Sequence, residues 1–424
     1  MEKYQLNDVY GITRDVPLNY VERGTVDNTL LSNLNRKRNI TIFGSSKQGK
    51  TCLRKHCLAP NSYIVVQCSN RWQLADLNAN ILKRAGYEIT ASNKTTIGGN
   101  AKVTASLSGK FFGLYAGVSG EEGTVNSQET VMQPLELDME DVNDVIDALK
   151  QINFCNYIIL EDFHYLKTEV QKDFAIELKA FHENSNLCFI IIGVWLDENK
   201  LAIYNGDLTG RLIPINADSW NDAELRSVIT SGEKLLNIKF DEAFISALLK
   251  ESNGNVYIVQ EACYYACNME GITETQEALK SIGESLSARE IVLQIVNGQS
   301  GRYNTFLTSY ANGFQDTALE MHKWLLYPVL TAQPDMLMRG LSYRYIREVL
   351  EKNHPKRDTL NPGNITQALQ SVASLQLSKS IQPIIMDYDA SNLKLHIVDR
   401  GFIIWLNVQN RNELLSEIGL PETT

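Results

Sequence analysis

Eight consecutive residues, from Gly44 to Thr51, have the types and order that a phosphate-binding loop requires. They read Gly-Ser-Ser-Lys-Gln-Gly-Lys-Thr and fit the pattern G-x₄-G-K-T without a gap. The glycines let the backbone curl so that its N–H groups point inward at an anion. Lys50 is expected to reach the β- and γ-phosphates, and the Thr51 hydroxyl is expected to ligate Mg²⁺. The segment therefore predicts a site for ATP or ADP with Mg²⁺.

The residues around this loop predict the elements that have to hold it. A strand is expected over 39–43 and a helix from Lys50 to about Cys57, so the loop joins a strand to a helix. The positive end of the helix dipole then adds to the attraction for phosphate. The residues expected to bind the nucleotide are Gly44, Ser45, Ser46, Lys47, Gln48, Gly49, Lys50, Thr51 and Cys52.

A second set of chemically capable residues follows the apolar run at 157–160. Glu161 and Asp162 end this predicted buried strand, where one carboxylate can hold Mg²⁺ and the other can orient the attacking water. Motif order gives the metal to Glu161 and the water to Asp162, but side chains alternate across a strand, so the roles could be reversed. The alternative is an acidic pair on a surface loop. For His164, packing or support of these acids is as good an interpretation as chemistry.

Strands and helices alternate through the first half of the chain, which is typical of an α/β fold with a parallel sheet. We expect a P-loop NTPase core over residues 1–220, an α-helical lid over 221–316 and a winged-helix domain over 317–424. The lid is expected to be all-α. The winged helix is inferred from three helical stretches followed by two short strands, 383–388 and 393–398.

A glycine-rich stretch at about 92–133 interrupts the predicted core. It alternates polar and apolar residues over 103–108 and continues past Gly109 into 111–118, which predicts an inserted β-hairpin. The hairpin is either a plain surface feature or a contact element for a partner or a neighbouring subunit.

Composition limits the classes of partner. The 424 residues carry 40 Lys and Arg against 50 Asp and Glu, a formal charge of −10, which gives no general attraction to nucleic acid or anionic membrane. The N-terminus lacks a signal-peptide core, and no apolar run approaches the roughly 20 residues that span a bilayer. The seven cysteines include no zinc-site spacing. We expect a cytoplasmic protein that makes no membrane contact.

The residues 160–166, Leu-Glu-Asp-Phe-His-Tyr-Leu, resemble the hhh-D-D-x-H-x-h signature of STAND ATPases, the signal-transduction branch close to AAA+ proteins. The stretch 252–258 is similar to that group's lid motif, and the order of domains also resembles that of origin-recognition ATPases. Two residues depart from the pattern. Glu161 replaces the first aspartate and Val256 replaces the lid proline, which puts the metal geometry and the adenine contact in question.

The resemblance implies roles for two arginines. Arg23, in the segment Tyr-Val-Glu-Arg at 20–23, is similar to the linker that meets the nucleotide base; the alternative is an ordinary salt bridge at a helix start. Arg211 precedes the last predicted core strand, where related ATPases place an arginine that reaches a γ-phosphate in the same subunit or the next. The alternative is a surface arginine. Trp195 stands where a polar sensor residue would be expected, and we assign it to packing.

The predicted winged helix is a poor candidate for binding DNA. Between Leu341 and Arg400 there are eight Lys and Arg against six Asp and Glu, and 359–378, which holds the would-be recognition helix, has no charged residue. Cations that neutralise phosphates supply most non-specific DNA affinity. Gln367 and Gln370 could read bases, but a protein-contact or autoinhibitory role is favoured.

These patterns together predict an ATP-hydrolysing switch. What the resemblance implies is a form closed with ADP that opens and self-associates with ATP. No second catalytic motif is found, so we expect a separately encoded effector protein, with phage defence as a hypothetical setting. The alternatives are a DNA-binding ATPase of origin-recognition or transposition-helper type and a nucleotide-binding scaffold that barely hydrolyses ATP.

Overall fold

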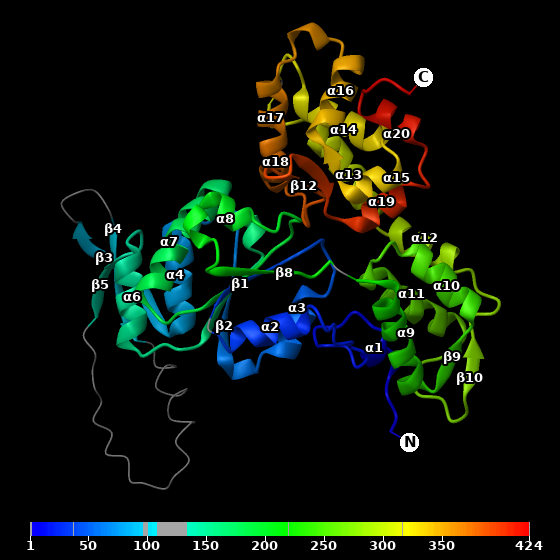
Figure 1. Ribbon diagram of the computed structural model, residues 1–424, viewed down its shortest axis with the longest axis horizontal. Helices are drawn as coiled ribbons and strands as arrows, with labels where there is room; N and C mark the ends of the chain where they lie inside the picture. Colours follow the sequence, from blue (N-terminus) through cyan, green and yellow to red (C-terminus); the bar gives the residue numbers. More distant parts are fainter. Residues whose placement is uncertain are drawn as a thin grey trace.

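The computed structural model describes residues 2–36, 38–95, 101–107, 134–218, 220–315 and 317–423. In Figure 1 an α/β core, a helical segment and a C-terminal unit follow one another along the chain, and the C-terminal unit lies above the other two. We use these three names for residues 11–218, 220–315 and 317–423.

The core is built on a five-stranded sheet in the order β2-β6-β7-β1-β8, with every pair parallel. This sheet confirms the predicted α/β fold of a P-loop NTPase. Apolar residues, many of them β-branched, fill the strands, and β1, β6 and β7 lie at its buried centre. The strands are β1 (Asn39–Phe43), β2 (Tyr63–Gln67), β6 (Tyr157–Glu161), β7 (Phe189–Ile192) and β8 (Leu212–Asn216).

Helices cover both faces of this sheet and make two separate apolar layers. One layer packs α4 (Leu74–Ala85), α6 (Val142–Gln151) and α7 (Thr168–Asn184) against the sheet. The other packs α2 (Asp27–Leu34) and α3 (Lys50–Cys57) against the opposite face. A short helix, α8 (Lys200–Tyr204), follows β7. Because the strands are parallel, the loops that follow them meet at one edge of the sheet.

The inserted segment differs from the predicted hairpin. Strands β3 (Tyr87–Thr95), β4 (Ala101–Leu107) and β5 (Leu135–Asp138) form an antiparallel sheet in the order β3-β4-β5. The strand predicted at 103–108 is therefore present, but it pairs with residues outside the predicted insertion. The strand predicted at 111–118 lies outside the described residues.

The helical segment contains α9 (Asp222–Leu236), α10 (Glu242–Glu251), α11 (Val256–Met269), α12 (Ala288–Asn297) and α13 (Ser300–Ala311). The prediction that it is all-α is wrong, since β9 (Ile238–Phe240) and β10 (Lys280–Ile282) pair in parallel. The N-terminal helix α1 (Leu6–Val9) also packs here, because Tyr10 donates to the carbonyl oxygen of Ile229 at 2.5 Å. The predicted core, residues 1–220, includes α1. In the structure, α1 packs against the helical segment.

The C-terminal unit has the order of elements that the winged-helix prediction requires, with extra helices. Its third helical stretch is broken at Ser371 into α17 and α18. The elements are α14 (Met321–Thr331), α15 (Pro334–Arg339), β11 (Leu341–Ser342), α16 (Tyr343–Asn353), α17 (Pro362–Gln370), α18 (Val372–Ser378), β12 (Met386–Asp389), β13 (Lys394–Ile397), α19 (Arg400–Leu406) and α20 (Arg411–Glu417).

The C-terminal unit is joined very differently to its two neighbours. It shares one apolar core with the helical segment, where the rings of Tyr303, Phe402 and Trp405 lie 5.2–5.6 Å apart. Its apolar contact with the core is a small separate cluster of Val194, Leu377, Ile384 and Val398. The helical segment and the C-terminal unit therefore form one packed body.

Within the described ranges, no helix combines the length and the apolar character that crossing a bilayer demands.

Gln376 offers a test of how α18 is fixed in the C-terminal unit. Its fully buried amide donates to the carbonyls of Val372 and Met386 and accepts from the backbone N–H groups of Ile385 and Met386. Replacing it by leucine leaves the Ile385 and Met386 backbone groups without this partner, so Gln376→Leu should lower the free energy of unfolding by roughly 2–4 kcal/mol. Urea unfolding measures this. Gln370→Leu, at an exposed position on α17, should change stability by less than about 1 kcal/mol.

Candidate functional site

The loop from Gly44 to Thr51 lies at the carboxyl edge of the sheet, between β1 and α3. Its backbone takes positive φ angles at Gly44 (142°), Lys47 (63°) and Gly49 (79°). At Gly44 a side chain would also be crowded, because a Cβ would lie 3.1 Å from the backbone nitrogen of Asp218. The two glycines therefore allow the curled backbone that the motif predicts.

Lys50 begins α3 and folds back over this loop. Its ammonium group donates to the carbonyl oxygens of Gly44 at 3.0 Å and Ser45 at 2.5 Å, and the residue is 9% exposed. Burial lowers the pKa of Lys50 to about 8, against the smaller opposite effect of Asp218, Asp162 and Glu161. Lys50 is thus a desolvated cation that forms no ion pair with any described residue, as a phosphate site needs.

Glu161 lies beside Thr51, as the metal-side interpretation requires. Along β6, Ile158 and Leu160 pack on the α4–α6–α7 side and Ile159 on the α2–α3 side, so Glu161 turns toward α3. There the Thr51 hydroxyl donates to Glu161 Oε1 at 3.0 Å, and Arg54 forms an ion pair with Glu161 Oε2 at 3.2 Å.

Asp162 takes a different direction from Glu161. Its φ of 56° turns the chain out of the strand, and its carboxylate accepts a hydrogen bond from the side-chain amide of Gln67 at the end of β2. Burial and then the charge of Glu161 raise the pKa of Asp162, while Lys50 lowers it. A carboxylate with a raised pKa near Lys50 suits proton transfer with water.

The oxygen atoms of Thr51 and Glu161 fit a magnesium ion. Mg²⁺ prefers oxygen ligands and usually takes one or two from protein, with phosphate and water completing its shell. No cluster of three or more His, Cys, Asp or Glu suited to a metal occurs in the described part of the chain. Gln48, in the same loop, has unsatisfied hydrogen-bonding groups. Its side chain is fully buried, and neither of its polar atoms has a partner among the described residues.

Three residues outside this loop hold it in place, and sequence reasoning missed all three. The Asp218 carboxylate accepts from the Ser45 N–H at 2.8 Å and the Ser45 hydroxyl at 2.7 Å, and it forms an ion pair with Arg400 at 3.1 Å. The Ser46 N–H donates to the carbonyl oxygen of Val398 at 2.8 Å. Val398 and Arg400 belong to the C-terminal unit. The available signal for Asp218 was an acid two residues after the end of a core strand. The other two residues carried no such signal.

The helical segment meets the same loop. The Lys47 ammonium lies 4.0 Å from the centre of the Tyr257 ring and donates to Gln299 at 3.3 Å. Arg400 also donates to the carbonyl oxygen of Asn253 at 3.0 Å, in the stretch that resembles a lid motif. Both the helical segment and the C-terminal unit therefore contact this loop of the core.

Arg23 is connected to the other end of the loop through Trp220. Its guanidinium stacks on the Trp220 ring at 4.1 Å and donates to the carbonyl oxygen of Ala217 at 2.8 Å, and Trp220 in turn donates to the carbonyl oxygen of Gln48 at 3.4 Å. Contact of Arg23 with a base stays a prediction. Cys52, on α3, is half-buried.

Arg211 is not brought to the loop of its own chain. It precedes Leu212, which pairs with Asn39 at the start of β1, whereas the loop follows the end of β1. There it forms an ion pair with Glu183 at 2.7 Å. Contact of Arg211 with the γ-phosphate of a nucleotide bound to a second copy of the chain stays a prediction.

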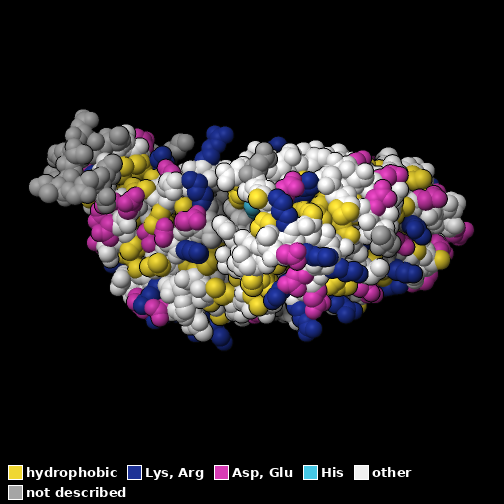
Figure 2. All heavy atoms as spheres, turned by 90° about the horizontal axis from the view of Figure 1, so that it is seen from above, with side chains coloured by type: hydrophobic (Ala, Val, Ile, Leu, Met, Phe, Trp, Pro, Cys, Tyr) yellow, Lys and Arg dark blue, Asp and Glu magenta, His cyan; other side chains and the backbone are white. Residues whose placement is uncertain are grey.

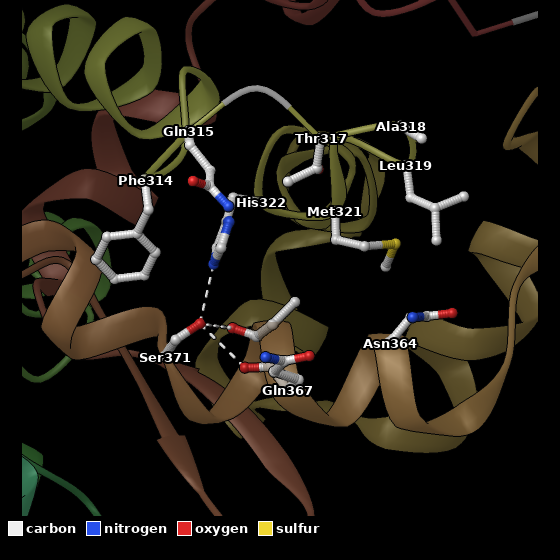
Figure 3. Close-up of a pocket in the computed structure, with 11 residues that line it drawn as sticks. Phe314, Gln315, Thr317, Ala318, Leu319, Met321, His322, Asn364, Gln367 and Ser371 are labelled. Carbon is white, nitrogen blue, oxygen red and sulfur yellow. Dashed lines mark hydrogen bonds between the residues drawn. The ribbon is translucent and has the colours of Figure 1, made fainter.

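One side of the would-be recognition helix lines a cavity next to other parts of the chain. Figure 3 shows Asn364, Gln367 and Ser371 of this helix lining a cavity of about 420 Å³ with Phe314 and His322 across it. No Lys or Arg is among the residues that line it. On the face seen in Figure 2, acidic and basic side chains are interspersed. These features offer a DNA backbone no continuous basic track on that face.

No protein-family model matches the chain, and no curated protein matches it. A solved Walker-type ATPase of Pyrococcus abyssi aligns with 94% of this chain and 100% of its own, at 11% identity and a TM-score of 0.50. The ORC1 protein of Aeropyrum pernix, in complex with DNA, aligns over 98% of both chains at 10% identity and a TM-score of 0.45. A STAND protein with a tetratricopeptide repeat sensor from Pyrococcus horikoshii aligns with 96% of this chain and 45% of its own, at 13% identity and a TM-score of 0.38.

At 11% identity the first of these matches shows a shared fold and nothing finer. Together with the parallel sheet and the loop between β1 and α3, it gives this chain the fold of a P-loop ATPase.

The low pKa of Lys50 predicts how nucleotide affinity depends on pH. Phosphate binds the protonated ammonium, and at pH 9 only about a tenth of free molecules would carry that charge when the pKa is about 8. ADP should therefore bind about tenfold more weakly at pH 9 than at pH 7, as measured by calorimetry. In Lys50→Arg, whose guanidinium stays charged, the affinity should be flat over this range. Equal pH dependence in the two proteins would contradict this account.

Proposed function

For a chain with this fold, we propose that the loop from Gly44 to Thr51 binds ATP with Mg²⁺ and that the protein hydrolyses it. The observation that carries the proposal is the position of Glu161. Its carboxylate lies on the Thr51 hydroxyl, next to a buried lysine that begins the same helix. Three chemically different groups thus converge at the carboxyl edge of a parallel sheet, where ligands of such sheets bind.

Each group has a distinct part in this proposal. Lys50 gives up its bonds to the Gly44 and Ser45 carbonyls and pairs with the β- and γ-phosphates. Thr51 and Glu161 hold Mg²⁺, which when bound neutralises phosphate charge. Asp162, kept in place by Gln67, orients the attacking water and accepts its proton. The backbone N–H groups of the loop bind the phosphate oxygens.

Replacing Asp162 tests hydrolysis separately from binding. Asp162→Asn should keep ATP affinity within about threefold while lowering the turnover number by about 10²–10⁴, the usual loss when a general base is removed. Phosphate release under saturating ATP measures this. Asp173→Asn, at an exposed position on α7, should leave turnover unchanged. If the native protein binds ATP but turns it over no faster than Asp162→Asn, the protein is a nucleotide-binding scaffold.

We further propose that hydrolysis controls the contact between the C-terminal unit and the core. A γ-phosphate is a charged acceptor and competes with the neutral Val398 carbonyl for the Ser46 N–H. ADP lacks this group and leaves the contact intact, so the closed form is the ADP form. The small apolar contact with the core supports this, since it opposes separation weakly. We also propose that the open form self-associates and that it acts on a separately encoded effector protein.

Arg400 tests the closed form. Arg400→Ala removes the ion pair with Asp218 and the bond to the Asn253 carbonyl, so ADP should be released about tenfold faster, the effect of about 1.4 kcal/mol. In size-exclusion chromatography, more of this variant than of the native protein should self-associate with a slowly hydrolysed ATP analogue. Arg347→Ala, which removes an exposed pair with Glu351, is the matched control and should behave as native. Unchanged ADP release in Arg400→Ala would show that the contact does not gate the nucleotide.

A further inference from the structure

Arg54 lies beside the candidate magnesium site, on α3, three positions after Thr51. It is 6% exposed, and its Nε atom lies 3.2 Å from Glu161 Oε2. Neither of these two atoms forms a hydrogen bond within the described structure, so the contact is an ion pair held by charge. A buried guanidinium is costly unless an acid compensates its charge, and Glu161 is the acid that does so here.

The two oxygens of the Glu161 carboxylate have different partners. Thr51 donates to Oε1 at 3.0 Å, and Arg54 pairs with Oε2. Residues three apart on a helix lie on one side of it, which is why both side chains reach the same carboxylate. Because a carboxylate is planar, a charge fixed at one oxygen sets the direction of the other. Arg54 thus leaves Oε1 beside the Thr51 hydroxyl, and these are the two oxygen atoms that fit Mg²⁺.

Tyr63, at the start of β2, restrains Arg54 from a second side. The guanidinium carbon lies 5.1 Å from the centre of the Tyr63 ring, within the range of a cation–π interaction. In the sheet, β2 is the neighbour of β6, the strand that ends in Glu161. The ring and the carboxylate therefore both restrict where the guanidinium can lie.

The length of the Glu161 side chain makes such a restraint useful. Glutamate has one more rotatable bond than aspartate, the other acid found at such strand ends, and fixing a side chain costs rotamer entropy. Mg²⁺ demands nearly ideal octahedral geometry, so a carboxylate that changes rotamer is a poor ligand for it. An ion pair at Oε2 limits these rotamers before a metal ion binds.

We propose that Arg54 is a positioning residue, which holds Glu161 for Mg²⁺ through the ion pair at Oε2. This inference rests on the proposed function, because it requires a nucleotide and Mg²⁺ to bind at the loop from Gly44 to Thr51. Groups that orient a metal ligand from behind usually contribute a factor of about 10–100 to metal affinity. Arg54 acts only through Glu161, so its removal changes what Mg²⁺ adds to nucleotide binding and leaves the contribution of the loop itself unchanged.

Calorimetry with ADP, in the presence of Mg²⁺ or of a chelator, separates these two contributions. Arg54→Met removes the charge and keeps a flexible, unbranched side chain against Tyr63. With chelator, this variant should bind ADP within about threefold of the native affinity. The Mg²⁺ concentration that gives half of the gain in ADP affinity should rise about tenfold or more. If Arg54 served packing alone, the variant would unfold at a lower temperature but need no more Mg²⁺.

Three further variants make the test specific to the ion pair. Arg54→Lys keeps a charge next to Glu161, so its Mg²⁺ requirement should be within about threefold of native. Lys55→Met removes the next cation of the same helix, which donates to the carbonyl oxygen of Arg14, and should behave as native. In a Glu161→Gln background, which already lacks the charged ligand, adding Arg54→Met should raise the Mg²⁺ requirement by less than about twofold.

Thermal unfolding of each variant confirms that it folds. Should Arg54→Met fail to fold because Glu161 is left buried without its partner, Arg54→Gln replaces it. The glutamine amide is a donor without charge, and a neutral donor holds a carboxylate less strongly than a cation does. The Mg²⁺ requirement of Arg54→Gln should therefore rise by roughly threefold or more.

The outcomes separate this inference from the proposed function. If the native protein binds no ADP, the proposed function is wrong and this inference with it. If native ADP binding does not respond to Mg²⁺, nucleotide binding stands but the role of Arg54 is overturned. The same holds if Arg54→Met needs as much Mg²⁺ as the native protein, or less, since a lower requirement would make Arg54 a competing cation.

Discussion

The buried carboxylate of Asp218 links the phosphate-binding loop to the rest of the molecule. It is 7% exposed, and it holds both the N–H and the hydroxyl of Ser45 on one side and the Arg400 guanidinium on the other. Removing the arginine would leave a buried charge compensated only by hydrogen bonds, which is costly. The shape of the loop and the position of the C-terminal unit are therefore coupled through one side chain.

The way the three units pack decides which of them can move. The helical segment and the C-terminal unit share an apolar core with a cluster of aromatic rings, so separating them would expose a large apolar surface. The core and the C-terminal unit meet instead through four buried apolar residues, a few polar bonds and a cavity of about 920 Å³. In the proposed switch, the helical segment and the C-terminal unit would therefore move together relative to the core.

The candidate site depends on the alternation of side chains along β6. Ile158 and Leu160 pack on one face of the sheet and Ile159 on the other. Because side chains alternate along a strand, Glu161 must lie on the same face as Ile159. The turn of Asp162 into a positive φ then separates the two acids, and their neighbours differ accordingly: Thr51 and Arg54 for Glu161, Gln67 for Asp162. Two adjacent carboxylates thereby acquire different environments, which suits different roles.

Local sequence patterns were enough to predict the α/β sheet, the loop between β1 and α3 and the strand that ends at the acids, because glycine freedom, helix start and strand periodicity are local properties. They left the roles of Glu161 and Asp162 open, missed Asp218, Val398 and Arg400, and missed the pairing of β9 with β10. These depend on contacts between residues far apart in the chain. Ser46 and Val398, for example, are hydrogen-bonded although they lie near opposite ends of the sequence. Only the tertiary structure brings such residues together, because packing of whole elements, not local preference, sets their distance.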